Sequence, residues 1–197
     1  MPDFYDRHYK TYGTSTFSVD PSVFMDPIAS ILAPGASVLD AGCGSGRDLL
    51  WLKNRGFHVT GFEKSEKLAA MARKKAGCPV IKGDFEVFDF SALSFDAVTA
   101  AGSLVHIPRE RISSVIANIS RALAGNGLFY ISLKEGDSTA TDDTGRIFYF
   151  WRDNELSPLF NQLGFEAIRF SRTLSALNAK DTWLGYVLQR RTDHHTP

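Results

Sequence analysis

The stretch VLDAGCGSGRD, residues 38–48, decides the fold class of this 197-residue chain. It joins a short apolar run, Ser37–Ala41, to an amphipathic segment that runs from Asp48 to Arg55 and stops at Gly56. A strand, a glycine-rich turn and a helix in this order are typical of a sheet that binds ligands at the carboxyl ends of its strands. Glycines in the turn let a ligand approach the backbone closely.

The segments that follow repeat this alternation of strand and helix. We expect further strands over residues 57–62, 79–81, 95–100 and 128–133, and helices over residues 65–75 and 109–123. Such an order predicts right-handed crossovers and a parallel sheet with helices on both faces. After Gly145 a helix over residues 154–163 precedes two strands, 165–173 and 181–190. With no helix between them, these two strands are expected to form an antiparallel hairpin at the sheet edge. Residues before about Leu32 are expected to form one or two helices.

Length and composition limit the class of protein. A chain of this length with no linker predicts one domain, residues 1–197. Lys and Arg together number 22, as do Asp and Glu, and this zero net charge counts against a nucleic-acid partner. No apolar run reaches about 18 residues, and the first residues lack the pattern of a signal peptide. Cys43 and Cys78 belong to no CxxC or CxxH pair, which predicts a reducing compartment and no metal site. We therefore expect a cytoplasmic protein, with His194 and His195 in a frayed tail.

The glycine spacing and the acidic residues after it favour a nucleoside without phosphate. The loop reads G-x-G-x-G after Asp40, whereas a dinucleotide fold requires a glycine where Arg47 stands, and no phosphate-binding G-x-x-x-x-G-K-[ST] occurs. Glu63 ends the second predicted strand, and Asp84 follows the third. Carboxylates at these strand ends suit ribose hydroxyls and an adenine amino group, with Phe85 beside the ring, and they disfavour phosphate.

These features together resemble the class I S-adenosylmethionine-dependent methyltransferases, over about residues 19–190. The resemblance rests on Asp40-x-Gly-x-Gly-x-Gly, Glu63, Asp84, Phe95-Asp96 and the segment from Leu123 to Gly127 before a strand. It is strongest to small stand-alone enzymes of the ubiquinone-biosynthesis and tellurite-resistance type. It implies an α/β fold: a doubly wound, mostly parallel seven-stranded sheet with an antiparallel last strand. It also implies S-adenosylmethionine as cofactor, S-adenosylhomocysteine as product, and transfer to an O, N or S atom of a small molecule.

The resemblance also implies a set of cofactor contacts. The glycine loop would line the methionine portion, Glu63 the ribose, Asp84 with Phe85 the adenine, and residues after the fourth strand the sulfonium. Arg47 is a candidate partner for the cofactor carboxylate, since a helix N-terminus also favours anions. The role of Asp40 stays open between cofactor contact and orientation of loop amides, and Cys43 is expected to pack rather than react. The predicted cofactor-binding residues are Asp40, Ala41, Gly42, Cys43, Gly44, Gly46, Arg47, Glu63, Lys64, Asp84, Phe85, Ala101, Gly102 and Leu104.

His106 is the candidate catalytic residue. It follows the fourth strand, and a general base is required only where the acceptor must lose a proton. A histidine that packs or caps the loop before Pro108 remains the alternative. The same segment reads Ala101-Gly102-Ser103-Leu104 and so lacks the [DNS]-P-P-[YFW] tetrad of base-N methyltransferases.

Two segments are candidates for the acceptor side. Tyr5, Tyr9 and Tyr12 share one helical face, and residues 1–20 resemble a segment that folds over the cofactor in related enzymes. Their rings would attract a sulfonium cation or simply bury an aromatic stripe. The insertion over residues 135–150 holds Arg146, which either binds an acidic acceptor or is solvated, and Tyr149.

The expected partner is therefore a small-molecule acceptor, with no nucleic acid or membrane, and the expected assembly is a monomer or homodimer. Two alternatives remain open: an NAD-dependent oxidoreductase, which shares the doubly wound sheet, and a non-catalytic module that binds S-adenosylmethionine.

Overall fold

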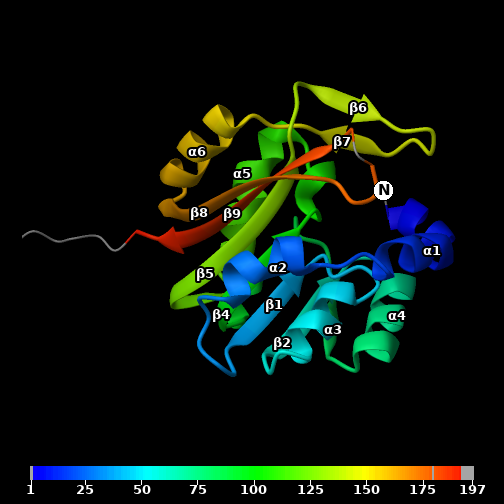
Figure 1. Cartoon of the computed structure of the whole chain (residues 1–197), viewed down its shortest axis with the longest axis horizontal. Helices are drawn as coiled ribbons and strands as arrows, with labels where there is room; N and C mark the ends of the chain where they lie inside the picture. The colour runs from blue at the N-terminus through cyan, green and yellow to red at the C-terminus, as the bar shows by residue number, and fades with distance from the viewer. Residues whose placement is uncertain (1, 179, 192–197) are drawn as a thin grey trace, which may run out of the picture.

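Seven strands form the central sheet of this computed structural model, which describes residues 2–178 and 180–191 (Figure 1). The strand order is β3-β2-β1-β4-β5-β9-β8. The first five strands in that order run parallel, and β9 runs antiparallel to both of its neighbours. This confirms the predicted doubly wound sheet with an antiparallel last strand. The strands of this sheet are β1 Ser37–Ala41, β2 His58–Glu63, β3 Val80–Lys82, β4 Phe95–Ala101, β5 Leu123–Lys134, β8 Phe165–Leu174 and β9 Thr182–Arg190.

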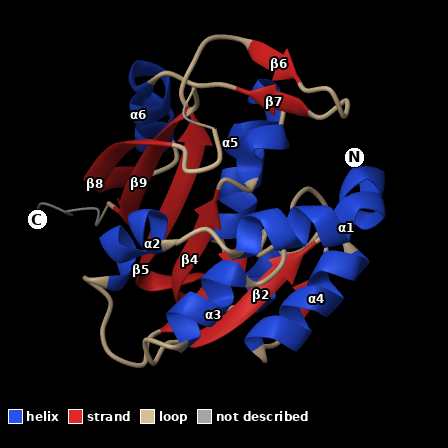
Figure 2. Ribbon diagram, turned by 45° about the vertical axis from the view of Figure 1, so that its right-hand side comes forward, coloured by secondary structure: helices blue, strands red, loops and turns tan. Residues whose placement is uncertain are grey.

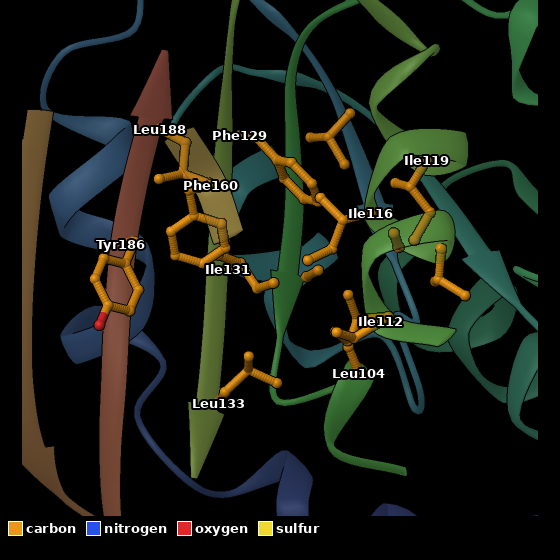
Figure 3. Packing of buried hydrophobic residues seen from close by; sticks show 14 of the residues in the cluster. Leu104, Ile112, Ile116, Ile119, Phe129, Ile131, Leu133, Phe160, Tyr186 and Leu188 are labelled. Atoms are coloured by element: carbon orange, nitrogen blue, oxygen red, sulfur yellow. The ribbon is translucent and has the colours of Figure 1, made fainter. Parts of the chain in front are cut away.

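Helices cover both faces of the sheet (Figure 2). Successive residues of β1 point to opposite faces, so Val38 belongs to one core cluster and Leu39 to the other. The cluster around Val38 joins α2, α3 and α4, and the cluster around Leu39 joins α5 and α6, as Figure 3 shows for the second. The helices are α1 Pro2–Phe17, α2 Ser22–Ala29, α3 Arg47–Lys53, α4 Glu66–Ala76, α5 Arg109–Ser120 and α6 Asp153–Gln162, with short 3₁₀ segments η1 Phe90–Ala92 and η2 Leu104–His106.

The predicted elements are present, and their ends differ mostly by one or two residues. The predicted strand over residues 37–41 has those bounds. Ser65 caps α4 by accepting a hydrogen bond from the Leu68 backbone N–H, and Gly77 ends it in a left-handed conformation. The predicted helix over residues 109–123 was too long: it ends at Ser120, and β5 begins at Leu123 because Leu123 pairs with Phe95 across an irregular register.

A second, two-stranded sheet was not predicted. Strands β6 Thr139–Thr141 and β7 Ile147–Tyr149 form an antiparallel hairpin within the insertion after β5. Figure 1 shows this hairpin beyond the end of the central sheet. Its position brings an insertion close to the strand ends where a ligand is expected.

Helix α1 docks onto α4 rather than onto the sheet. The Asp6 carboxylate accepts hydrogen bonds from Ser65 Oγ at 2.5 Å and from the Lys67 backbone N–H at 3.3 Å. Farther along, a Cβ on Gly13 would lie 2.5 Å from Met71 Sδ, so this glycine permits a close approach of the two helices. A kink at His8, with φ −108° and ψ 16°, separates the first turns of α1 from the rest.

Two kinds of feature are absent from residues 2–178 and 180–191. No helix there is both long and apolar enough to cross a bilayer. No group of three or more His, Cys, Asp or Glu side chains there is arranged to hold a metal ion. His194 and His195 lie outside the described residues.

Candidate active site

A cavity of about 350 Å³ lies at the carboxyl ends of β1, β2, β3 and β4. Its floor consists of the glycine loop and the segments that follow β2, β3 and β4, while α1 and the β6–β7 hairpin close two of its sides. A smaller cavity of about 140 Å³ adjoins it. The two share the wall residues Tyr12, Gly42, Gly44, Ala101 and Gly102.

Two positions of the loop require glycine for different structural reasons. Gly42 has φ +86°, and a Cβ there would lie 2.3 Å from Ser103 Cβ, so only glycine fits between the loops after β1 and β4. Gly46 also has φ +86°, but its missing Cβ would lie 2.8 Å from Ala72 Cα in α4. Gly42 therefore keeps the cavity floor thin, whereas Gly46 serves helix packing and lies outside both cavity walls.

Glu63 connects the end of β2 to the glycine loop. One carboxylate oxygen accepts the Gly44 backbone N–H at 2.9 Å and the other accepts the Ser65 backbone N–H at 2.8 Å. Burial raises the pKa of Glu63, and these backbone hydrogen bonds act in the opposite direction. The side chain lines the large cavity, where its oxygens have lone pairs left for a ligand's hydroxyl groups.

Asp40 is buried beneath the loop and does not line either cavity. Its Oδ1 accepts a hydrogen bond from Thr99 Oγ1 at 3.0 Å, while Oδ2 has no hydrogen-bond partner among the described residues. Burial, and next the nearby negative charge of Asp48, raise the pKa of Asp40 to about 8. A protonated, buried Asp40 supports the floor from below rather than presenting a charge to a ligand.

Asp84 and Phe85 form the wall beyond β3. Asp84 is ion-paired with Lys64 and accepts the Glu86 backbone N–H at 3.1 Å. Burial alone would raise its pKa, but the hydrogen bond to Lys64 and the other interactions outweigh it and hold the pKa below its ordinary value. Phe85 stacks on Phe62 with ring centroids 5.4 Å apart and an interplanar angle of 21°. This wall presents a carboxylate and an aromatic edge to the cavity.

His106 is held by two segments that are distant in sequence. Its Nδ1 lies 2.6 Å from the Ile147 carbonyl oxygen in β7, and its Nε2 lies 2.7 Å from the Tyr5 hydroxyl in α1. Burial lowers the pKa of His106. The imidazole ring also lies 4.6 Å from the Phe148 ring, centroid to centroid.

The three tyrosines of α1 do not all line the large cavity. Tyr5 and Tyr12 line the large cavity, with their rings edge to face at 5.0 Å. Tyr9 lies outside both cavities, and the Lys67 ammonium group is 5.4 Å from the centre of its ring. The kink at His8 breaks the regular spacing that would place all three together.

The other predicted residues differ in their partners and in whether they line a cavity. Arg146 is ion-paired with Asp142, NH2 to Oδ2 at 2.7 Å, and its guanidinium lies over the Phe4 ring at 4.6 Å. Arg47 lines only the small cavity and is ion-paired with Asp48, Nε to Oδ1 at 2.6 Å. The small-cavity wall also includes Cys43, and the large-cavity wall includes Tyr149.

Two predicted residues line neither of these cavities and are fully buried. Leu104 begins η2 and lies in the core cluster of Figure 3. The Ala41 carbonyl oxygen accepts a hydrogen bond from Ser103 Oγ at 2.7 Å.

Sequence reasoning missed part of the wall. Ser103 and Ser65 directly follow predicted residues, so reading one position farther would have found them. Ile147 was missed because the hairpin was not predicted. Arg111 and Glu86 line the cavity as an ion pair, NH1 to Oε1 at 2.5 Å, and no sequence signal joins them.

The chain is similar in sequence to known methyltransferases. Residues 38–127 match the family model described as a methyltransferase domain. A probable S-adenosyl-L-methionine-dependent methyltransferase TehB from Haemophilus influenzae is 24% identical over 186 residues, which is 91% of this chain and 60% of that protein. A ubiquinone biosynthesis O-methyltransferase from Hahella chejuensis is 34% identical over 117 residues, 56% of this chain and 48% of that protein. The chain covers between 27% and 60% of the length of the first five curated relatives it matches.

Solved structures share the fold. The 1,6-didemethyltoxoflavin-N1-methyltransferase of Burkholderia thailandensis, with bound 1,6-didemethyltoxoflavin and S-adenosylhomocysteine, superposes with a TM-score of 0.70 at 23% identity, covering 98% of this chain and 91% of that one. The magnesium protoporphyrin IX methyltransferase of Synechocystis, with bound S-adenosylmethionine, gives a TM-score of 0.68 at 21% identity, covering 96% and 85%. The sequence match covers 90 of the 197 residues, and the solved structures show that the chain shares the fold of S-adenosylmethionine-dependent methyltransferases.

Proposed function

We propose that this protein transfers a methyl group from S-adenosylmethionine to an O, N or S atom of a small molecule. The observation that carries the proposal is the set of hydrogen-bond acceptors in the large cavity. Glu63 and Asp84 lie at the ends of the neighbouring strands β2 and β3. At the end of β1, Gly42 and Gly44 have no side chain to cover the backbone. The hydroxyl and amino groups of an adenosine are donors, so the acceptors fit a nucleoside, and two carboxylates would repel a phosphate.

Different residues of the site would bind different parts of the cofactor. Glu63 would hold the ribose hydroxyls, Asp84 with Phe85 the adenine, and the glycine loop the methionine portion, which the small cavity next to it accommodates. The same role assignments follow from the family resemblance. When bound, S-adenosylmethionine supplies an activated methyl group, so the protein's tasks are to align the acceptor and exclude water.

The acceptor side would be built by two segments around His106. Residues 1–20 would act as a lid, since α1 brings Tyr5 and Tyr12 to the cavity and is anchored through Asp6. Residues 135–150 would shape the acceptor pocket through the hairpin. His106 would serve as general base, because its low pKa leaves the imidazole unprotonated near neutral pH.

Several relatives act on small molecules according to their names, including a ubiquinone-biosynthesis O-methyltransferase and a magnesium-protoporphyrin O-methyltransferase. A small acceptor also suits the zero net charge of the chain. A cytoplasmic location, the absence of a nucleic-acid partner and a monomeric or homodimeric state belong to the same proposal.

Calorimetric titration with S-adenosylhomocysteine tests the cofactor assignment. In Glu63→Gln one carboxylate oxygen becomes an amide NH2 group and the charge is lost, so a ribose hydroxyl would lose a hydrogen bond to a charged group, which contributes about 1.5–3 kcal/mol. We therefore expect an affinity at least about tenfold weaker than that of the wild type. Glu66→Gln is the control, because it removes the same charge from an exposed position nearby in α4.

Three outcomes contradict the proposal. Equal affinity in Glu63→Gln and the wild type refutes the ribose site. Stabilisation by NAD without stabilisation by S-adenosylhomocysteine points to an oxidoreductase. Tight cofactor binding without methylation of any compound in a broad panel of small acceptors points to a non-catalytic binding module.

A further inference from the structure

His106 has a defined tautomer in this structure. The Ile147 carbonyl oxygen can only accept a hydrogen bond, so the Nδ1 atom 2.6 Å away must carry the proton. In a neutral imidazole the other nitrogen is then an acceptor, and the Tyr5 hydroxyl at 2.7 Å donates to Nε2. The Nε2 atom of His106 is therefore basic, and it accepts its hydrogen bond from the Tyr5 hydroxyl group.

Four polar side chains face His106: Tyr5 from α1, Arg146 and Asp142 from the hairpin, and Lys134 from β5. The Tyr5 hydroxyl is protonated, since burial raises its pKa despite the opposing charge of Arg146. Burial and the two cations lower the pKa of His106, which outweighs the opposing effects of Asp142 and of the Ile147 carbonyl.

The cations near the cavity already have acidic partners. Arg146 is paired with Asp142 at 2.7 Å, and Asp142 also accepts hydrogen bonds from the Arg146 backbone and from Thr144. The Lys134 ammonium group lies 2.6 Å from the Asp181 carboxylate. The two cations in the cavity wall are likewise paired, Lys64 with Asp84 and Arg111 with Glu86. An acidic acceptor would therefore have to share a cation that a carboxylate already neutralises.

We propose that the acceptor is a neutral molecule whose hydroxyl or ring N–H group replaces Tyr5 as the hydrogen-bond donor to Nε2 of His106. This rests on the proposed function and narrows its acceptor class. During transfer the acceptor's O–H or N–H bond breaks and its proton goes to Nε2. The acceptor atom keeps the electron pair and bonds to the methyl carbon, and the electrons of the broken carbon–sulfur bond stay on sulfur.

Tyr5 can yield its place without unfolding α1. It lies on the first turns of the helix, before the kink at His8, whereas Tyr12 lies beyond the kink. Asp6 holds the backbone of those turns against Ser65, so the exchange requires only a rotation of the Tyr5 side chain. Aromatic and aliphatic side chains, including Tyr149, Ile147 and Ile107, would enclose the rest of the acceptor.

Nuclear magnetic resonance of histidine-labelled (¹⁵N) protein tests the tautomer directly. The His106 signals are identified by their loss in His106→Asn, both in the free protein and with S-adenosylhomocysteine added. We expect the Nδ1–H form and a pKa below the ordinary value near 6.5. An Nε2–H form, or protonation at the ordinary pKa, overturns the proposal.

A set of three probes tests the acceptor class in the presence of S-adenosylhomocysteine. Phenol offers a hydroxyl, anisole has the same ring with the hydroxyl methylated, and benzoate is an anion. We expect phenol alone to shift Nε2 of His106, and to bind several-fold more tightly to Tyr5→Phe, in which the competing hydroxyl is missing. Tyr9→Phe is the matched control on the same helix, and we expect it to leave the phenol affinity at the wild-type value.

The outcomes separate this proposal from the proposed function. No response to phenol in Tyr5→Phe, equal responses to phenol and anisole, or tighter binding of benzoate overturns the acceptor class while cofactor affinity stays intact. Failure of S-adenosylhomocysteine to bind by calorimetry overturns the proposed function, and the His106 tautomer can still be read in the free protein.

Discussion

Replacing Gly42 by alanine tests whether the cavity floor depends on a bare backbone. Gly42 has φ +86°, and the added Cβ would lie 2.3 Å from Ser103 Cβ and 3.3 Å from Phe85 Cζ. Ser103 is itself fixed, because its Oγ donates a hydrogen bond to the Ala41 carbonyl oxygen at 2.7 Å. The clash involves a Cβ atom rather than the flexible end of a side chain, so one of the two loops must move.

Gly56 provides a matched control. Its φ is +88°, and a Cβ there meets nothing within 4 Å. Both substitutions place an alanine in a left-handed conformation, which costs about 1–2 kcal/mol. Only Gly42→Ala adds overpacking, which typically costs about 1–3 kcal/mol more. In a chain of this size that difference lowers the Tm by about 2–12 °C beyond the effect of Gly56→Ala.

Urea denaturation gives the two free energies of unfolding, and calorimetry gives the affinities for S-adenosylhomocysteine. We expect Gly42→Ala to be the less stable variant and to lose most of its cofactor affinity, because the displaced loop forms the cavity floor. Gly56→Ala should bind like the wild type. Equal losses of stability in the two variants, or wild-type affinity in Gly42→Ala, would refute the reasoning.

Two further predictions concern one buried and one partly buried polar group. Burial raises the pKa of Asp40 to about 8, so the folded protein keeps a proton that the unfolded chain releases near pH 3.8. The free energy of unfolding should therefore fall as pH rises from about 4 to 8, by up to about 1.4 kcal/mol per pH unit. Unfolding measured across this range should show a weaker slope for Asp40→Asn, and parallel curves would contradict the assignment. Asn118 Nδ2 donates to the Phe85 and Phe88 carbonyl oxygens at 2.9 Å, so Asn118→Ala should destabilise the protein by about 1–3 kcal/mol and weaken S-adenosylhomocysteine binding several-fold. Ser114→Ala, on the same helix, removes only an exposed hydrogen bond to its own helix and should change neither value; equal effects of the two variants would argue against a positioning role for Asn118.

The sheet was predictable because its signals are local. The apolar run at Ser37–Ala41, the glycine loop and the cap at Ser65 each act within a few residues, and parallel pairing then aligns their carboxyl ends. The same rule predicted Glu63, which ends a strand, and Asp84, which follows one, and both line the cavity.

The rest depended on contacts between distant segments. The Tyr5–His106 hydrogen bond joins residues 101 positions apart, and no periodicity encodes it. Helical spacing grouped Tyr9 with Tyr5 and Tyr12, but Tyr9 lies outside the cavity that the other two line, and a kink at His8 interrupts the helix between Tyr5 and Tyr9. Leu104 matched the family's position, but the turn into η2 directed it to the core. The β6–β7 hairpin was missed because its strands have three residues each and its first strand is wholly exposed.

The β6–β7 hairpin has a consequence for how this protein could diversify. It is inserted between β5 and α6 and pairs only with itself as a sheet. None of its described residues is a buried member of either core cluster, although Phe148 packs against one of them as a partly buried side chain. Changes in its length or sequence would therefore leave the folding of the central sheet almost untouched, yet they would move the carbonyl group that orients His106. The hairpin that shapes the acceptor pocket in our proposal can thus mutate under little constraint from stability, so new acceptor preferences would be accessible by changing a surface loop.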